Sequence, residues 1–418
     1  MTTIDTGPAR NAWRRETPGC EGWARSARPG DPNKLLLVSA DCHANEPFTY
    51  LATYIEPGYR ARIPSMERHD DGSEWLITEG NAPQRVKGPT ATREAPTAVG
   101  SRMDDEDVRR NASGRQVTER LRDQDADGVD AEIIFPNKGL LGWATPDPVF
   151  GMAMCRAWNR WAYDTYAAEG WHGGRTLPLA CIAAGDLAGA IAEVAWAAER
   201  GWAGLCLGNA PVYGPKSPDK PEYNDPVFEP LWSAIEEAGL AVTFHVSTGR
   251  DPRAVKGEGG AVVNYVCHSM ETTIEPLVQL IASGVLDRHP GLRVGLVESG
   301  IGFVPWLIET MDWAHKAHHF WVRPELPEPP STYFRRQCFA TFQEDHAGLA
   351  AVEHHDLVDN MLWANDYPHH EGSWPHSAAS IERQMAHLSD TSRARILGLN
   401  AARVFNLPVT RPGATARA

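Results

Sequence analysis

Short apolar segments rich in β-branched residues recur along the chain between stretches of helical periodicity. Eight of these segments predict strands, at residues 35–41, 130–136, 176–183, 203–207, 240–246, 292–298, 337–343 and 360–366. The helices between them carry end signals: one begins at Asp225 and Pro226 and ends at Gly239, and another runs from Asp186 to Gly201. Eight strands that alternate with helices predict parallel strands with right-handed crossovers, and therefore an α/β fold of the (β/α)8 TIM barrel type.

The segment between the first two strands is too long for a simple connection. It covers about residues 44–129 and contains a β-rich sequence at residues 74–78. We interpret it as a long insertion after strand 1 that forms a small β unit or lid over the barrel mouth. The expected organisation is an N-terminal extension at residues 1–34, one barrel domain at residues 35–407 and a C-terminal tail at residues 408–418.

A second excursion, at residues 315–336, is rich in proline, aromatic residues and histidine. We interpret it as a segment that covers the site or meets another subunit.

Composition narrows the class of protein. The chain has 418 residues, 42% of them hydrophobic, which is enough to bury a large core, and its net charge of −14 repels phosphate groups. The seven cysteines include no Cys-x-x-Cys pair, so neither a disulfide framework nor a thiolate zinc module is predicted. No apolar run reaches the length of about 18 residues that a membrane helix needs. We therefore expect a cytoplasmic protein that binds a small-molecule substrate, with no nucleic acid and no membrane as partners.

Residue types that bind metals stand at the ends of four predicted strands. Asp41 and His43 come at the end of the first strand, His245 ends the fifth, Glu298 the sixth and Asp366 the eighth. Asp41 and His43 share a face because side chains two positions apart in a strand point the same way. In a (β/α)8 barrel the carboxyl ends of the strands meet at one mouth. Carboxylate and imidazole groups bind zinc, manganese or iron, so we predict a divalent metal site at this mouth.

Each candidate also has a purely structural alternative when it is taken alone. His245 could be a buried histidine bonded to the backbone, and Glu298 could cap the next helix. His268 follows the fifth strand, where it could hold a second metal or bond to the backbone. Cys42 is interpreted as a small filler whose side chain faces away from its neighbours. Candidate substrate contacts are Trp143, Arg122, Lys138 and the insertion, together with one of the three histidines in the loop after the eighth strand, His369, His370 and His376.

Several short motifs accompany these residues, at positions 39–47, 125–130, 298–302, 365–369 and 400–405. With them the chain resembles the amidohydrolase superfamily over about residues 35–407. It is most similar to the amidohydrolase-related (amidohydrolase 2) branch, which includes aminocarboxymuconate semialdehyde decarboxylase and γ-resorcylate decarboxylase. The resemblance implies a divalent metal on Asp41, His43, His245 and Asp366. The decarboxylases carry a catalytic histidine where this chain has Glu298, and they begin with His-x-His or Glu-x-His in place of Asp-x-His.

The chain also resembles a smaller group in the superfamily, dinuclear iron or manganese-iron oxygenases such as 2-aminoisobutyrate hydroxylase. That resemblance implies two metals, the second held by Glu298 and His268, and a partner barrel subunit. Three functions therefore stay open. The first is hydrolysis or C–C lyase chemistry on a small polar metabolite through a metal-activated water, with Asp366 guiding the proton. The second is a dinuclear monooxygenase, and the third is a supporting metal-binding subunit. We expect a homodimer or a hetero-oligomer with a homologous barrel.

Overall fold

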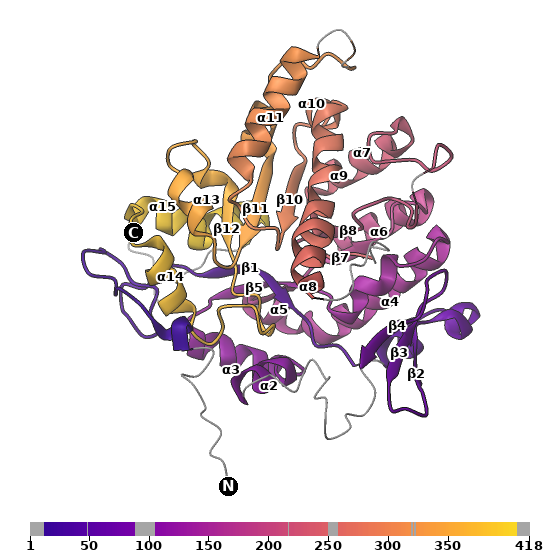
Figure 1. The fold of residues 1–418 in the computed structure, drawn as a ribbon, viewed down its shortest axis with the longest axis horizontal. Helices are drawn as coiled ribbons and strands as arrows, with labels where there is room; N and C mark the ends of the chain where they lie inside the picture. Colours follow the sequence, from indigo (N-terminus) through magenta and orange to yellow (C-terminus); the bar gives the residue numbers. More distant parts are fainter. Residues whose placement is uncertain are drawn as a thin grey trace.

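Parallel strands alternate with helices along most of the chain (Figure 1). The computed structural model describes residues 12–47, 49–87, 105–215, 217–249, 258–318, 321 and 323–407. The strands of the barrel, in chain order, are β1 (Val38–His43), β5 (Ala131–Phe135), β6 (Thr176–Pro178), β7 (Ala180–Ile182), β8 (Gly204–Leu207), β9 (Ala241–His245), β10 (Arg293–Val297), β11 (Cys338–Phe342) and β12 (Met361–Trp363).

These strands form two parallel sheets, in the orders β1-β5-β6 and β12-β11-β10-β9-β8-β7. The predicted third strand is divided between them, because β6 ends at Pro178 and β7 begins at Ala180. Proline has no backbone N–H to give to a ladder, which makes it a natural end for a strand segment. The residue between the two segments, Leu179, donates its backbone N–H to Ile134 at 3.0 Å.

Beyond β12, the chain returns to the first strand. The backbone N–H of Asp366 donates to the carbonyl of Asp41 at 3.0 Å, and that of His43 donates to the carbonyl of Tyr367 at 2.6 Å. These bonds connect the last strand region with β1, so the eight predicted strand regions occur in the predicted order and the barrel-type fold is confirmed. The end strands differ in their bounds: β1 extends to His43, and β12 ends at Trp363, so that Asp366 lies beyond it.

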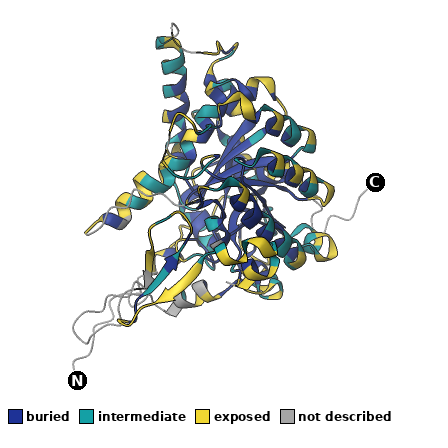
Figure 2. Ribbon diagram, turned by 90° about the vertical axis from the view of Figure 1, so that its right-hand side faces the viewer, coloured by how far each residue is buried: buried dark blue, intermediate teal, exposed yellow. Residues whose placement is uncertain are grey.

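Helices surround the strands, and their buried faces are turned toward the sheets (Figure 2). The two helices predicted from end signals are present. Asp186 caps α6 by accepting from the N–H of Gly189, and Gly239 ends α7 with φ 65°. No helix of the described residues is long and apolar enough to cross a membrane. The helices are α1 (Thr49–Tyr54), α2 (Asp105–Ala112), α3 (Val117–Asp127), α4 (Pro148–Tyr166), α5 (Ala168–Gly174), α6 (Leu187–Glu199), α7 (Glu229–Ala238), α8 (Gly260–Val263), α9 (Glu271–Ala282), α10 (Val285–Arg288), α11 (Val304–Ala317), α12 (Pro330–Gln337), α13 (His346–Ala351), α14 (Ser377–Met385), α15 (Asp390–Ala394) and α16 (Asn400–Val404).

The insertion after β1 contains the predicted β unit. Its strands β2 (Ser65–Arg68), β3 (Glu74–Ile77) and β4 (Gln84–Lys87) form an antiparallel sheet. Arg62 forms an ion pair with Asp147 at 2.8 Å, and Asn81 donates its side-chain N–H to the carbonyl of Ala144 at 2.7 Å. Both partners lie in the connection that follows the carboxyl end of β5, so the insertion lies at the mouth end of the barrel, as expected. Residues 88–104 of the insertion lie outside the described residues.

The second excursion lies at the other end of the barrel. Pro324 and Leu326 pack against Gly284, which follows α9 and precedes β10, and therefore lies near the amino ends of the strands. The interpretation of this segment as a cover over the site is wrong, because the chain leaves α11 at the end of the helix that points away from the mouth. The alternative interpretation, contact with another subunit, stays a prediction.

Candidate metal centre

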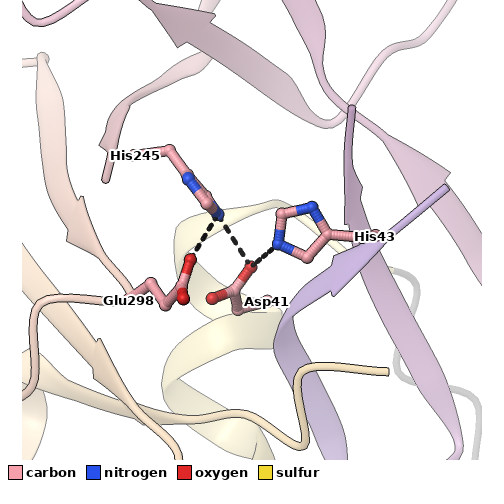
Figure 3. Close-up of side chains that lie close together, drawn as sticks. All are labelled: Asp41, His43, His245 and Glu298. Atoms are coloured by element: carbon pink, nitrogen blue, oxygen red, sulfur yellow. Dashed lines mark hydrogen bonds and ion pairs between the residues drawn. The ribbon is translucent and has the colours of Figure 1, made fainter. Parts of the chain in front are cut away.

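Four side chains from three strand ends converge in the barrel mouth (Figure 3). The Nε2 atom of His245 lies 3.3 Å from Oδ1 of Asp41 and 3.4 Å from Oε2 of Glu298. The Nε2 atom of His43 lies 3.6 Å from Oδ1 of Asp41 and 3.5 Å from Oδ1 of Asp366. All five residues are buried. Ligand atoms that share one metal at bond lengths of about 2.1 Å in a tetrahedral arrangement lie about 3.4 Å apart, so these separations suit a common cation.

Backbone carbonyl groups orient the rings of the two histidines. The Nδ1 atom of His43 lies 3.0 Å from the carbonyl of Pro136, and Nδ1 of His245 lies 2.6 Å from the carbonyl of Val246. A carbonyl can only accept, so in each ring Nδ1 carries a proton and Nε2 is the atom that faces the cluster. This is the tautomer that metal-binding histidines use.

Two of the carboxylates stand on left-handed backbone. Glu298 has φ 64° and Asp366 has φ 54°, a region that residues other than glycine seldom adopt and that costs roughly 1–3 kcal/mol. Backbone hydrogen bonds hold both: the N–H of Glu298 donates to Oγ1 of Thr341 at 2.9 Å, and that of Asp366 to the carbonyl of Asp41. Strain of this kind concentrates at functional sites, and here it marks two candidate ligands.

The cluster places three carboxyl groups beside two histidines in a buried space, where burial and mutual repulsion oppose the ionisation of the carboxyl groups. Burial raises the pKa of Asp366 well above its usual value, and it raises the pKa of Glu298 to about 8. Against the effect of burial, the carboxylates of Asp41 and Glu298 raise the pKa of His245 to about 9. Burial lowers the pKa of His43, and the neighbouring rings of His369 and His245 lower it further.

Several buried ligand atoms also lack hydrogen-bond partners: Oδ2 of Asp41, Nε2 of His43, and Oδ1 and Oδ2 of Asp366. Leaving a buried polar atom unpaired costs about 1–3 kcal/mol. A divalent cation would supply both the missing charge and the missing partner, and the donor set of imidazole nitrogens and carboxylate oxygens suits such an ion. The residues present therefore fit a metal.

Two further residues join the cluster from the loop after β12. The ring of His369 stacks on that of His43 with centroids 4.0 Å apart, and its Nδ1 lies 3.4 Å from Oδ1 of Asp366. Glu371 groups with Glu298 and Asp366 as a third set of potential ligand atoms. Sequence reasoning treated His369 only as a candidate substrate contact and did not identify Glu371. The available signal was the run of ligand types at residues 366–371.

His268 is placed apart from these residues. It belongs to none of the potential metal-binding groups of the described chain, and its Nδ1 lies 3.1 Å from Oδ1 of Asn264, one turn earlier in a π-helix, η6 (Asn264–Met270). The structure therefore does not bring His268 and Glu298 together as the expected second metal site requires. In the π-helix, the ring of His268 faces the side chain of Asn264 on the same helix.

The remaining candidates fall into two groups. Cys42 is buried, with its Sγ 3.1 Å from Oγ of Ser39, and it belongs to none of the metal-binding groups, as expected for a filler. The other candidates already have partners: Trp143 donates to the carbonyl of Ile182, Arg122 is paired with Asp123, His370 with Glu371, and His376 with Glu106. The side chain of Lys138 lies outside the described residues.

A buried arginine connects the segments that carry the ligands. Arg120, on α3, forms an ion pair with Glu132 of β5 at 2.5 Å and donates to the carbonyl of His43. Its guanidinium lies 4.8 Å from the ring centroid of Tyr367, the residue after Asp366. Sequence reasoning missed this residue, since nothing in a helical arginine indicates that it will be buried. Arg120 supports the backbone on both sides of the cluster.

A parallel barrel with buried potential ligands at the carboxyl ends of its strands is the framework of many metal-dependent enzymes. A sequence model of the amidohydrolase family matches residues 41–407. The chain therefore belongs to the amidohydrolase family, as the motifs predicted.

Curated relatives of the chain include decarboxylases. γ-Resorcylate decarboxylase from Rhodococcus jostii (strain RHA1) is 26% identical over 215 residues, which are 48% of this chain and 57% of that protein. The match thus spans little more than half the length of that relative. γ-Resorcylate decarboxylase from Rhizobium sp. (strain MTP-10005) is 23% identical over 305 residues, which are 68% of this chain and 87% of that protein.

Solved structures share the fold. An amidohydrolase from Mycobacterium avium subsp. paratuberculosis K-10 superposes with a TM-score of 0.69 at 20% identity, covering 90% of this chain and 99% of that one. 5-Carboxyvanillate decarboxylase from Novosphingobium aromaticivorans DSM 12444, complexed with manganese, superposes with a TM-score of 0.62 at 15% identity, covering 94% and 99%. At these identities the likeness establishes the fold of the chain.

Proposed function

We propose that this protein is a metal-dependent decarboxylase that removes CO2 from a small carboxylated aromatic acid. The observation that carries the proposal is Glu298, a buried carboxyl group with a raised pKa beside the candidate metal ligand His245. Two curated relatives named γ-resorcylate decarboxylase support the reaction type. The relatives and structures named above include no oxygenase, and His268 is separate from Glu298, so the dinuclear oxygenase hypothesis gains no support.

The metal would be held by Asp41, His43, His245 and Asp366, two carboxylates and two imidazoles. Asp41, His43 and His245 belong to one potential metal-binding group, which also includes Glu298, and Asp366 joins it through His43. Manganese suits this mixture of donors, and a decarboxylase of the same fold binds it. When bound, a divalent ion supplies Lewis-acid stabilisation of negative charge on substrate oxygens. In both rings Nδ1 is bonded to a backbone carbonyl, so Nε2 is the atom available to a metal, and His245 gives up its Nε2 proton when the metal binds.

Decarboxylation breaks the bond between the carboxylate carbon and the ring carbon. The electron pair stays on the ring carbon, which takes up one proton, and CO2 leaves. The proton donor must therefore be protonated at neutral pH and must stand at the mouth. Glu298 stands at the mouth, and in the metal-free protein burial raises its pKa to about 8, which favours the protonated form. In this mechanism a carboxyl oxygen of Glu298 delivers the proton.

The test uses manganese-loaded protein and a panel of hydroxylated aromatic acids that includes 2,6-dihydroxybenzoate and 5-carboxyvanillate. We expect CO2 release in at least one case and, in deuterated water, one deuterium at the vacated ring position. Glu298→Gln should abolish turnover and retain manganese, whereas Glu298→His should retain part of the activity. Glu309→Gln, at an exposed carboxylate on α11, is the control.

Two results would overturn the proposal. One is the absence of CO2 release from every acid by fully loaded protein. The other is unchanged turnover in Glu298→Gln, which would remove the carboxyl group from the chemistry.

A further inference from the structure

The short helix η1 (Ala12–Arg15) lies beside α14, near the loop that follows β12 (Figure 1). It precedes residues 41–407, the part of the chain that the family model matches. Its Arg14 is only 7% exposed, although arginine is seldom buried unless its charge and its donors are satisfied. The guanidinium of Arg14 donates to the carbonyl of His370 at 2.7 Å and to the carbonyl of Gly372. A residue outside the family match therefore holds the loop after β12 by its backbone.

A second buried arginine donates to the same two carbonyls. Arg110, on α2 of the insertion, reaches the carbonyl of His370 at 3.0 Å and that of Gly372 at 3.1 Å. Glu106, one turn earlier on α2, pairs with Arg110 at 2.7 Å. Hydrogen bonds from charged donors are roughly twice as strong as those between neutral groups. We call Arg14 and Arg110 the arginine clamp, because they fix this loop from two separate segments of the chain.

The clamped loop carries residues of the candidate metal centre. His369 and Glu371 alternate with the two clamped residues, and both belong to groups of potential ligands that include Asp366. The N–H of His369 donates to the carbonyl of Asp366 at 2.8 Å, which closes the loop into a turn. A Cβ at Gly372 would lie 2.9 Å from that same carbonyl oxygen, so the turn packs directly on the backbone of Asp366. A displacement of the clamped carbonyls would therefore move Asp366, His369 and Glu371 together.

The segment that carries Arg14 is itself anchored on α14, the helix that follows the loop. Arg383, on α14, donates to the carbonyl of Glu16 at 2.9 Å. Thr17 donates to the buried carboxylate of Glu382, on the same helix, at 2.5 Å. These bonds fix the position from which Arg14 reaches the loop.

We propose that Arg14 is a positioning residue of the metal centre, which with Arg110 holds the loop in the conformation that directs Asp366, His369 and Glu371 into the barrel mouth. Arg14 acts through the backbone of the loop and belongs to none of the potential metal-binding groups of the described chain. The proposal rests on the metal centre of the proposed function but not on the reaction, so it is tested without turnover.

The first test compares Arg14→Met with Arg25→Met in the metal-free protein by hydrogen–deuterium exchange and mass spectrometry. Arg25 is the matched control, because it lies in the same N-terminal extension and donates to the carbonyl of Lys34 at 2.9 Å, away from the loop. We expect the peptide that covers residues 366–373 to exchange about tenfold faster in Arg14→Met, since a charged hydrogen bond to the loop is lost, and at the wild-type rate in Arg25→Met. Arg14→Lys, which keeps a charged donor, should restore part of the protection. Unchanged exchange of this peptide in Arg14→Met, or an increase spread evenly over the whole chain, would overturn the proposal.

The second test measures manganese binding by electron paramagnetic resonance. We expect Arg14→Met to bind manganese about tenfold more weakly than the wild type and to give an altered zero-field splitting at saturation, because the backbone of the candidate ligand Asp366 is no longer fixed. Arg25→Met should match the wild type in both respects. Wild-type affinity together with a wild-type spectrum in Arg14→Met would overturn the proposal. A wild type that binds no manganese would refute the metal centre and with it both proposals, whereas the exchange test can fail by itself.

Discussion

Replacing Arg120 by methionine should weaken both the fold and the candidate metal centre. Methionine is unbranched and fills the space along the stem of the arginine, but it is shorter, carries no charge and donates no hydrogen bond. The variant leaves the carboxylate of Glu132 buried without its partner, and it removes the donor to the carbonyl of His43. It also removes the cation that lies over the ring of Tyr367. One substitution therefore acts on the backbone beside two candidate ligands.

The magnitude follows from the burial of the pair. Removing one partner of a buried ion pair costs about 3–5 kcal/mol because the remaining charge is not solvated. The entropy of unfolding near the midpoint is about 2.1 cal/mol/K per residue, so a chain of this size gives about 0.9 kcal/mol/K. We therefore expect Tm to fall by about 3–6 °C. Loss of a group that orients a metal ligand typically costs about 10–100-fold in metal affinity, which we expect for manganese.

The assay combines thermal unfolding by circular dichroism with manganese titration followed by electron paramagnetic resonance. In the double variant Arg120→Met/Glu132→Gln the unpaired charge is gone, so part of the stability should return while the metal affinity stays low. Arg393→Met is the control: Arg393 is also buried, but its partners are Met385, Leu388 and Asp390, away from the cluster. It should lose stability and keep its affinity. Wild-type metal affinity in Arg120→Met, or an equal loss in Arg393→Met, would refute the reasoning.

Three further predictions concern the core, the charge of the cluster and the metal. A Cβ at Gly295 would lie 2.1 Å from the ring of Phe339, so Gly295→Ala should lower the free energy of unfolding by about 1–3 kcal/mol, as measured by chemical unfolding. The control is Gly58→Ala, whose Cβ meets nothing within 4 Å and which should be as stable as the wild type. The raised pKa of Glu298 means that its ionisation opposes folding of the metal-free protein, so the stability of the wild type falls as pH rises from about 4.5 to about 8. The Tm of Glu298→Gln relative to that of the wild type should therefore increase over this range. A constant difference in Tm would contradict the burial of this charge. Manganese at 100 times its Kd should stabilise the wild type by about 2.7 kcal/mol, as measured by thermal shift, and should hardly stabilise His245→Ala. Equal shifts in Tm for the two proteins would show that His245 is not a ligand.

The strands and most of the candidate ligands were predictable because they obey simple periodic rules. A parallel barrel buries its strands on both faces, which produces the short apolar runs, and its topology brings the carboxyl ends of the strands to one mouth. Asp41, His43 and His245 lie within the strands, so their directions follow from the strand period. The β unit of the insertion was predictable because the β-rich sequence at residues 74–78 lies in a setting rich in glycine and aspartate.

Residues outside the strands were harder to predict, because loops and helix surfaces have no fixed period. Asp366 lies three residues beyond β12 on left-handed backbone, and this turn brings His369 back over His43. His268 seemed a ligand because it follows the strand of His245, yet the π-helix directs its ring toward Asn264. The burial of Arg120 depends on the approach of α3 to the end of β1, which lies far earlier in the sequence. Each outcome was decided by tertiary contacts.

The assignment of Glu298 as proton donor also agrees with the need to renew the proton after each turnover. Asp41 and Asp366 are completely buried, whereas Glu298 is 6% exposed and therefore has the contact with solvent that reprotonation requires. A carboxylate fully bound to a divalent ion would have its pKa lowered and would no longer hold a proton at neutral pH. The division of roles follows: the two inner carboxylates, with His43 and His245, suit the metal, and the outer one suits the proton. On this reasoning Asp366→Asn should lose manganese together with activity, whereas Glu298→Gln should lose activity alone. Loss of manganese in both variants would make Glu298 a ligand and would require a different proton donor.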